Sequence, residues 1–193
     1  MIGPAAPMSQ QQRIDLLGRL FTEPDQPLLR SRVAAAIVLL YAQPVSRIVR
    51  LTLDDVIVDN DTVRLRLGDP PSPVPGPVAE LLLSWIDQRT NMNTATNREA
   101  RWLFPGRRAG QPIHPETLGA LIKTLGIPST VGRVGVLHQH VLELPPPVVA
   151  DALGYHHKTT TRAAIHASTD WSRYASGPRA RKPSGWTPRT RDS

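Results

Sequence analysis

The sequence of 193 residues contains no cysteine. This absence excludes disulfides, zinc–thiolate sites, iron–sulfur clusters and thiol nucleophiles. Long apolar runs are also missing, because the longest one, Val33 to Ala42, is only about half as long as a membrane span. The N-terminus has no signal-peptide pattern. With 40% hydrophobic and 20% charged residues, the sequence therefore predicts a folded, soluble, cytoplasmic protein.

Lysine is nearly absent. Only Lys123, Lys158 and Lys182 occur, and all the other basic residues are arginines. Either a GC-rich coding bias or phosphate binding explains this, since a guanidinium matches phosphate oxygens in a bidentate way. Of the net charge of +7, most lies in residues 157–193, which carry 8 basic and 2 acidic side chains. That end of the chain is either a surface for a polyanion or a solvated tail.

Metal-binding and cofactor-binding patterns are missing as well. His138 and His140 stand on different faces of a predicted helix, and His156 and His157 are adjacent, so neither pair suits one ion. There is no glycine loop for phosphates and no dinucleotide fingerprint. We expect neither a metal site nor a cofactor.

Hydrophobic periodicity predicts an α+β fold that is mainly α, with a small antiparallel three-stranded sheet in the N-terminal half. The expected domains are a disordered lead-in with a short helix at 1–27, the main domain at 28–176 and a disordered basic tail at 177–193. Apolar and polar patterning predicts the following elements: an unstructured segment at 1–12, a helix at 14–20, a buried helix at 33–41, a hairpin at 56–67 with an edge strand at Val74, and helices at 78–88, 115–125, 133–144, 148–153 and 159–167. A polar loop is expected at 90–97, and Thr159 or Thr160 is the expected N-cap of the last helix.

Residues 148–167 are typical of a helix-turn-helix. A short helix ends at Gly154, a turn follows, and a second helix opens with threonines and Arg162. Hydroxyls and an arginine at a helix N-terminus can meet phosphates and base edges. Two helices that only pack at a corner, with the threonines as caps, would give the same pattern.

The order and spacing of several segments resemble the catalytic domain of the tyrosine recombinases (phage integrases). The similarity runs over residues 30–175 and rests on four stretches: Leu40-Tyr41-Ala42, Ile48 to Val56 followed by a hairpin, Trp102-Leu103-Phe104-Pro105, and Val148 to Thr161. The resemblance implies a DNA-binding fold. In that family a tyrosine attacks a DNA phosphate, while two arginines and a lysine or histidine stabilise the developing charge.

This chain departs from the family's pattern at most of those positions. Pro44 aligns with the first arginine, with Arg47 and Arg50 nearby, and residues 63–74 contain no lysine. The His-x-x-Arg box reads Thr130 to Arg133, which keeps only the arginine.

The end of the family's pattern is altered too. The histidine of the Leu-Gly-His box is displaced by one, to His156, and the nucleophile aligns with Ala164. Tyr174 lies 20 residues after Gly154, past the predicted helix. No intact catalytic set is expected, and Arg133 and His156 would be its remnants.

Two functions follow as hypotheses. The first is an integrase-like protein that binds DNA and does not cut it. The second is a helix-turn-helix transcriptional regulator that uses residues 148–167. A decaying gene product without a partner is the third reading. The residues expected to contact DNA are Arg47, Arg50, Arg133, His156, His157, Lys158, Thr160 and Arg162.

Overall fold

The computed structural model describes residues 8–22, 28–90, 101–127 and 131–175, with the backbone alone at Thr90, 131–135 and 168–175. The lead-in before residue 8, the polar loop expected up to residue 97 and the tail expected at 177–193 lie outside the described residues, apart from Thr90 at the loop's start.

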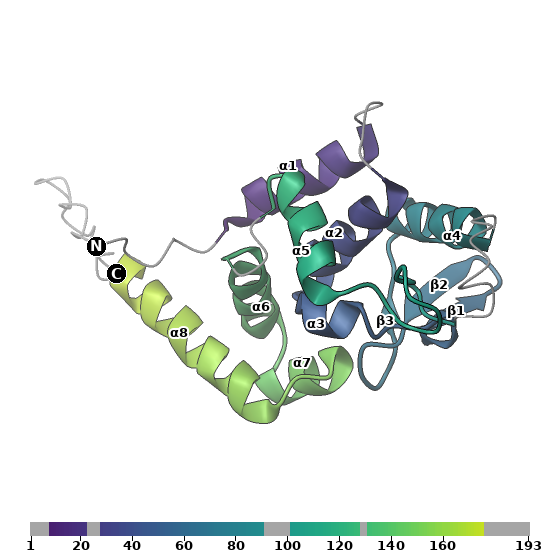
Figure 1. Cartoon of the computed structure of the whole chain (residues 1–193). Coiled ribbons are helices and arrows are strands. Elements are labelled where there is room, and N and C mark those ends of the chain that lie inside the picture. The colour runs from purple at the N-terminus through teal and green to yellow at the C-terminus, as the bar shows by residue number, and fades with distance from the viewer. Residues whose placement is uncertain (1–7, 23–27, 91–100, 128–130, 176–193) are drawn as a thin grey trace, which may run out of the picture.

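The described residues form helices around one small sheet, which confirms the mainly helical α+β prediction. The elements are α1 (Gln10–Thr22), α2 (Leu29–Tyr41), α3 (Val45–Ile48), the 3-10 helix η1 (Leu53–Asp55), β1 (Val56–Asp59), β2 (Thr62–Leu65), β3 (Ser72–Pro73), α4 (Gly76–Thr90), α5 (Pro115–Thr124), α6 (Val131–Glu143), α7 (Pro146–Leu153) and α8 (His157–Ala175). Figure 1 shows α2 in the middle of the molecule, between the sheet with α4 and the C-terminal helices.

Helix α2 forms the centre of the core, as its apolar sequence predicted. Every residue from Val33 to Leu39 is buried, because α1, α4, α5 and α6 all pack on it. A helix that is apolar all round needs such cover on every side. Helix α2 ends at Ala42, which adopts a left-handed conformation with φ 57°.

The hairpin of β1 and β2 forms around the Asx-rich turn, where Asn60 has φ 51°. Val56 pairs with Leu65 and Asp59 with Thr62 in an antiparallel register. The edge strand β3 covers Ser72 and Pro73, just before the expected Val74, whose N–H still donates to the carbonyl of Val63. These pairings complete the predicted three-stranded sheet in the order β1-β2-β3.

A tyrosine joins this sheet to the core. The Tyr41 hydroxyl donates to the Pro73 carbonyl over 2.7 Å. Burial raises the pKa of this phenol, which keeps it a neutral donor.

Several helix boundaries differ from the predictions. Helix α2 begins at Leu29 rather than at Val33, and the short helix α3 was not predicted. Helix α1 begins at Gln10, inside the segment expected to be unstructured, and its Leu20 is buried in the core. Helix α8 begins at His157 rather than at Thr159, and it continues to Ala175. Tyr174 is therefore within this helix and not beyond it.

The predicted N-cap of α8 is also wrong. His156 precedes the helix, and its Nδ1 accepts the N–H of Lys158. Thr160 lies in the first turn, and its hydroxyl donates to the carbonyl of His157 over 3.0 Å. The imidazole of His156 therefore accepts a hydrogen bond at the N-terminus of α8, where the sequence pattern predicted a threonine hydroxyl.

Within the described part of the chain, no helix has the length and apolar character that crossing a membrane requires.

Candidate nucleic-acid interface

The C-terminal end of α7 is covered by hydrogen-bond donors from two distant segments, which we call the α7 cap. Its donors are Gln43, Arg47, Asp69 and Ser72. The Arg47 Nη1 donates to the carbonyls of Leu153 and Gly154 over 2.9 and 2.8 Å. The last carbonyls of a helix have no partner within the helix, so these donors satisfy them from outside.

The other three members of the α7 cap act in the same way. Gln43 Nε2 donates to the Leu153 carbonyl over 3.0 Å. The Asp69 N–H donates to the carbonyl of Asp151 over 2.9 Å, and the Ser72 hydroxyl donates to that of Ala152 over 3.3 Å. Each of the four carbonyls from residue 151 to residue 154 therefore accepts a hydrogen bond from the α7 cap.

Arg47 also reaches the sheet. Its Nη2 donates to the carbonyl of Leu67, just after β2, over 2.9 Å. Glycines allow the close approach that this requires. A Cβ on Gly154, which has φ +63°, would lie 2.3 Å from the Leu67 oxygen, and a Cβ on Gly68 would lie 1.9 Å from the Asp151 oxygen. The α7–α8 turn is therefore pressed against the loop after β2.

These contacts change the interpretation of Arg47. The sequence predicted that it contacts DNA, but its guanidinium is bound to three backbone carbonyls within the protein. Arg50, in the turn that follows α3, is exposed and forms no side-chain hydrogen bond or salt bridge within the described residues. Of these two arginines, Arg50 is the one that remains open to a partner.

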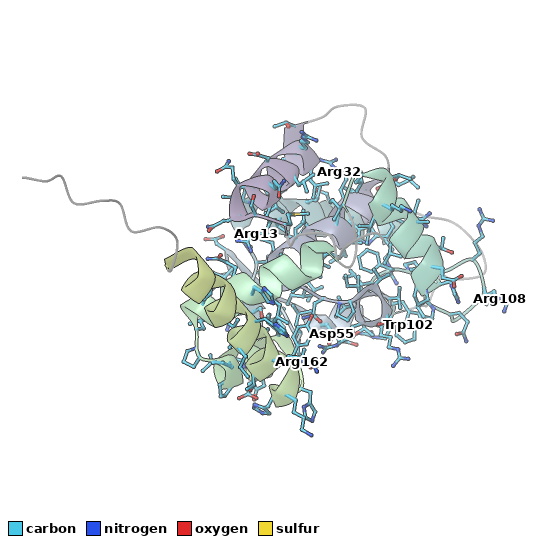
Figure 2. All side chains as sticks on the ribbon, turned by 90° about the vertical axis from the view of Figure 1, so that its left-hand side faces the viewer. Arg13, Arg32, Asp55, Trp102, Arg108 and Arg162 are labelled. Atoms are coloured by element: carbon cyan, nitrogen blue, oxygen red, sulfur yellow. The ribbon has the colours of Figure 1, made fainter. Side chains whose placement is uncertain are left out.

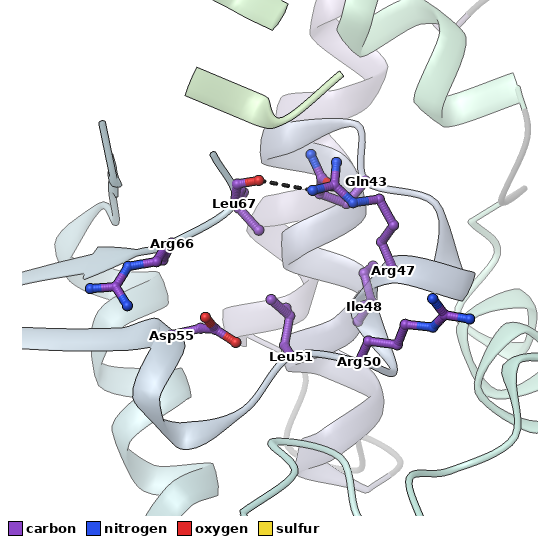
Figure 3. A pocket seen from close by; sticks show the side chains of 8 residues that line it. All are labelled: Gln43, Arg47, Ile48, Arg50, Leu51, Asp55, Arg66 and Leu67. Carbon is purple, nitrogen blue, oxygen red and sulfur yellow. Dashed lines mark hydrogen bonds between the residues drawn. The ribbon is translucent and has the colours of Figure 1, made fainter. Parts of the chain in front are cut away.

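Arg47 and Arg50 line the same cavity, which has a volume of about 270 Å³ (Figure 3). We call it the arginine cavity. Buried Ile48, Leu51 and Leu67 form its apolar part. Its lining residues are Gln43, Arg47, Ile48, Arg50, Leu51, Asp55, Arg66 and Leu67. Three guanidinium groups against one carboxylate give the cavity a positive balance, and low-dielectric walls strengthen such a field.

Arg66 was not among the residues predicted from the sequence. It is exposed, forms no side-chain hydrogen bond or salt bridge within the described chain, and is held in place by its backbone N–H, which donates to the carbonyl of Asp55. Its position just after a strand gives no local signal of a binding role, because only the tertiary structure places it in the lining of the arginine cavity.

Nearby Arg101 differs from Arg50 and Arg66, because it is paired with Asp54. Its Nε donates to the Asp54 carboxylate over 2.8 Å. The hydrogen bond from Arg101 holds the pKa of Asp54 below its ordinary value. The charge of Arg101 is thus neutralised locally.

The start of α8 carries the second group of cations. We call the exposed residues His156, His157, Lys158, Thr159, Thr161 and Arg162 the α8 surface. Figure 2 labels Arg162 on this helix. Lys158 and Arg162 form no side-chain hydrogen bond or salt bridge within the described residues, whereas His157 Nε2 lies 3.5 Å from an oxygen of Asp151. Thr159 and Thr161 are exposed residues that the sequence-based set omitted.

Thr160, which the sequence predicted to contact DNA, faces the other way. It is fully buried, on the same side of α8 as Ala163 and Ala167, which pack in the core. Its hydroxyl is already used by the carbonyl of His157. Thr160 is therefore part of the packed side of α8.

The arginine cavity and the α8 surface meet at one point in the fold. Gly154 lies against both Arg47 and Leu67, which line the cavity, and α8 begins three residues later. Arg47 and the start of α8 are therefore close neighbours. Arg133 lies in α6, but its side chain is outside the described part, so its phosphate contact stays a prediction.

Comparison with known proteins gives matches of structure only. No protein-family model matches the sequence, and no curated protein matches it. The fold matches the XerH site-specific recombinase bound to palindromic difH substrate, with a TM-score of 0.65 and 15% identity, and XerA recombinase, with 0.62 and 16%. It also matches the Tn1549 transposon integrase in complex with circular intermediate DNA, with 0.60 and 16%.

The chain has the fold of a tyrosine recombinase catalytic domain. The matches cover 89% of this chain with XerH, 93% with XerA and 90% with the Tn1549 integrase. They span 52%, 68% and 65% of those three chains, respectively. The recombinase-like fold was thus correctly inferred from the collinear stretches of sequence.

Among the residues that the structure describes, no group of three or more His, Asp or Glu side chains is placed to hold a metal ion.

Proposed function

We propose that this protein binds DNA through the α8 surface and the exposed arginines of the arginine cavity, and that it does not cut the strand. One observation carries the proposal. Within the described residues, Lys158 and Arg162 on α8 are exposed and form no salt bridge, and the same holds for Arg50 after α3 and Arg66 after β2, which line the arginine cavity. Exposed cations of this kind displace counterions from a phosphate backbone.

Two further features support this interpretation. The N-terminus of α8 adds the positive end of a helix dipole beside Lys158 and the hydroxyls of Thr159 and Thr161. The solved structures that share the fold include recombinases and integrases with DNA bound. Hydroxyl and amide contacts to phosphates position a protein on a duplex, whereas base contacts specify sequence.

The positions of Ala164 and Tyr174 are the reason to expect no cleavage. Ala164, a small apolar side chain, aligns with the family's nucleophile. Tyr174 lies on the same continuous helix α8, 10 residues after Ala164, which corresponds to about 15 Å along the axis. Phosphoryl transfer needs its nucleophile in line with the leaving oxygen, and misplacement by about 1 Å can cost about 100-fold in rate. Such a displacement disfavours Tyr174 as a nucleophile.

The binding experiment is a fluorescence-anisotropy titration of a duplex at several salt concentrations. Arg162→Ala is expected to weaken binding about tenfold and to reduce the slope of log K against log salt by about 0.9, the value of one phosphate contact. Arg19→Ala, on the exposed part of α1, serves as the matched control and should leave both unchanged. Equal binding by Arg162→Ala and the unmodified protein would refute the role of the α8 surface.

Cleavage is tested with a suicide DNA substrate. No covalent adduct is expected on a denaturing gel. An adduct that forms with the natural sequence and disappears in Tyr174→Phe would show that the protein cuts DNA.

The helix-turn-helix regulator remains the second candidate. It is favoured by the direct packing of α7 on α8 across a short turn. A regulator of this kind should bind as a dimer to a palindrome with half-sites about one helical turn apart. An integrase-like domain should bind as a monomer, so the stoichiometry on a duplex that carries a single half-site separates the two.

A further inference from the structure

Arg47 joins three segments that are far apart in the sequence. Its guanidinium binds carbonyls of Leu67, Leu153 and Gly154, at the end of the sheet and at the end of α7. We propose that Arg47 is a positioning residue, which fixes the α7–α8 turn to the sheet and so orients the α8 surface toward DNA without contacting DNA itself. This inference rests on the proposed function.

The geometry of the contacts requires a guanidinium. Nη1 donates to two carbonyls on one side while Nη2 donates to a third on the other. An arginine presents five N–H donors in a fixed planar fork, whereas a lysine ammonium is a single point on a flexible stem. A lysine at this position would keep the charge and could not hold the same three carbonyls together.

The same contacts also stabilise the positive charge of Arg47. All three acceptors are neutral carbonyls, and no carboxylate of the described residues forms a salt bridge with the guanidinium. Two of these carbonyls lie at the C-terminus of α7, where the helix dipole places a partial negative charge. The cation therefore stabilises the end of α7 in addition to filling its unmet hydrogen bonds.

The neighbours of Arg47 fix the same turn from the other direction. Gln43 Nε2 shares the Leu153 carbonyl, and the Tyr155 hydroxyl donates back to the carbonyl of Ala42, just after α2. His156 and the start of α8 come directly after Tyr155. Any shift of this turn must therefore also move the first cations of the α8 surface.

The deciding comparison is between Arg47→Lys and Arg19→Lys, on the exposed part of α1, in the same salt-dependent binding titration. If Arg47 orients the α8 surface, Arg47→Lys should lower the affinity of the folded protein for a duplex about tenfold, comparable to losing one hydrogen bond to a charged group. Arg19→Lys makes the same exchange of side chains outside the proposed site and should bind within about twofold of the unmodified protein. Circular dichroism confirms that each variant is folded at the temperature of the titration.

The variant Arg47→Ala separates a positioning role from direct contact with DNA. Arg47→Ala should weaken binding with an unchanged salt slope, whereas loss of a phosphate contact reduces the slope by about 0.9. A slope reduced by that amount in Arg47→Ala would overturn the proposal, and so would wild-type affinity in Arg47→Lys.

Amide hydrogen exchange without DNA tests the same inference independently of DNA binding. Arg47→Lys should speed exchange across residues 150–162, whereas Arg19→Lys should not. If the unmodified protein fails to bind DNA, the proposed function is refuted, while faster exchange in Arg47→Lys still supports the anchoring role. Unchanged exchange in Arg47→Lys would overturn that role whatever the DNA result.

Discussion

The α7 cap and the α8 surface are both rich in hydrogen-bonding groups, and both hold residues that the sequence assigned to DNA binding. In the α7 cap, Arg47 uses its donors on three carbonyls of the protein. On the α8 surface, Lys158 and Arg162 are exposed without a salt bridge within the described residues. A basic residue thus becomes a candidate for binding only when the fold leaves its charge unused.

The two sides of α8 repeat this contrast at shorter range. Thr160 is buried and bonded within the helix, while its neighbours Thr159 and Thr161 are exposed. Adjacent threonines of the same helical turn therefore have different roles, because a helix turns by about 100° per residue.

The largest expected effect tests how closely the α7 cap is packed. In Gly68→Ala, the new Cβ would lie 1.9 Å from the Asp151 oxygen, with two further backbone atoms within 3 Å. We expect the free energy of unfolding to fall by about 3 kcal/mol, since backbone on both sides must move. Thermal unfolding should show a melting temperature about 6–12 °C lower. Gly119→Ala in α5, where nothing lies within 4 Å, is the control and should be neutral or stabilising by up to about 1 kcal/mol.

Tyr155→Phe removes one hydrogen bond from the turn before α8. The carbonyl of Ala42, in a buried residue, then loses the phenol as its donor. The expected loss is about 1 kcal/mol of unfolding free energy, measured by chemical denaturation. Tyr41→Phe, which removes the hydrogen bond to Pro73 instead, should cost a similar amount without speeding exchange at the start of α8. Equal exchange at the start of α8 in the two variants would contradict the interpretation that the hydrogen bond of Tyr155 holds the α7–α8 turn in place.

Thr160→Val separates the packed side of α8 from its exposed side. The substitution keeps the shape of the side chain and removes the hydroxyl that donates to His157. Stability should fall by about 1 kcal/mol, and the salt slope of DNA binding should not change. A slope reduced as in Arg162→Ala would mean that Thr160 contacts DNA as the sequence first suggested.

The smallest effect concerns the exposed pair of Asp54 and Arg101. The folded-state pKa of Asp54 is lowered by the hydrogen bond from Arg101, so this carboxylate stabilises the fold above the ordinary pKa of aspartate, about 3.9. That contribution disappears as the pH falls through the lowered pKa. Asp54→Asn should therefore have a slightly lower free energy of unfolding than the unmodified protein at pH 7 and the same free energy of unfolding in strong acid. Chemical denaturation at both pH values measures this difference. A difference that persists in acid would point to another cause.

Most of the fold could be predicted from local patterns. The apolar run of α2 predicted a buried helix, the Asx-rich turn at residues 59–61 predicted the hairpin, and glycines predicted the ends of α5 and α7. The length of α8 was underestimated, because the polar run Ser168-Thr169-Asp170 hides the continuation of the helical spacing from Ala163 and Ala167 to Trp171 and Tyr174. The beginning of α1 was missed for a related reason, since a run of glutamines gives no hydrophobic signal.

The candidate site was predictable only in part. The exposed cations at the start of α8 follow from a helix-turn-helix pattern in a short stretch of chain. Arg47 could not be assigned correctly, because the carbonyls that it binds belong to residues 20 to 107 positions away. Arg66 was missed because its place in the cavity depends on the fold of the hairpin against the α3 segment. Gln43 gave no signal at all, since a single amide near a proline has no characteristic pattern.

The sequence alone determined the helices, the hairpin and the surplus of arginine, because propensity, periodicity and turn chemistry act over a few residues. The tertiary structure alone decided which of those arginines have their hydrogen bonds satisfied inside the protein. That choice depends on backbone carbonyls brought together from distant segments, and no local pattern in the chain encodes their positions.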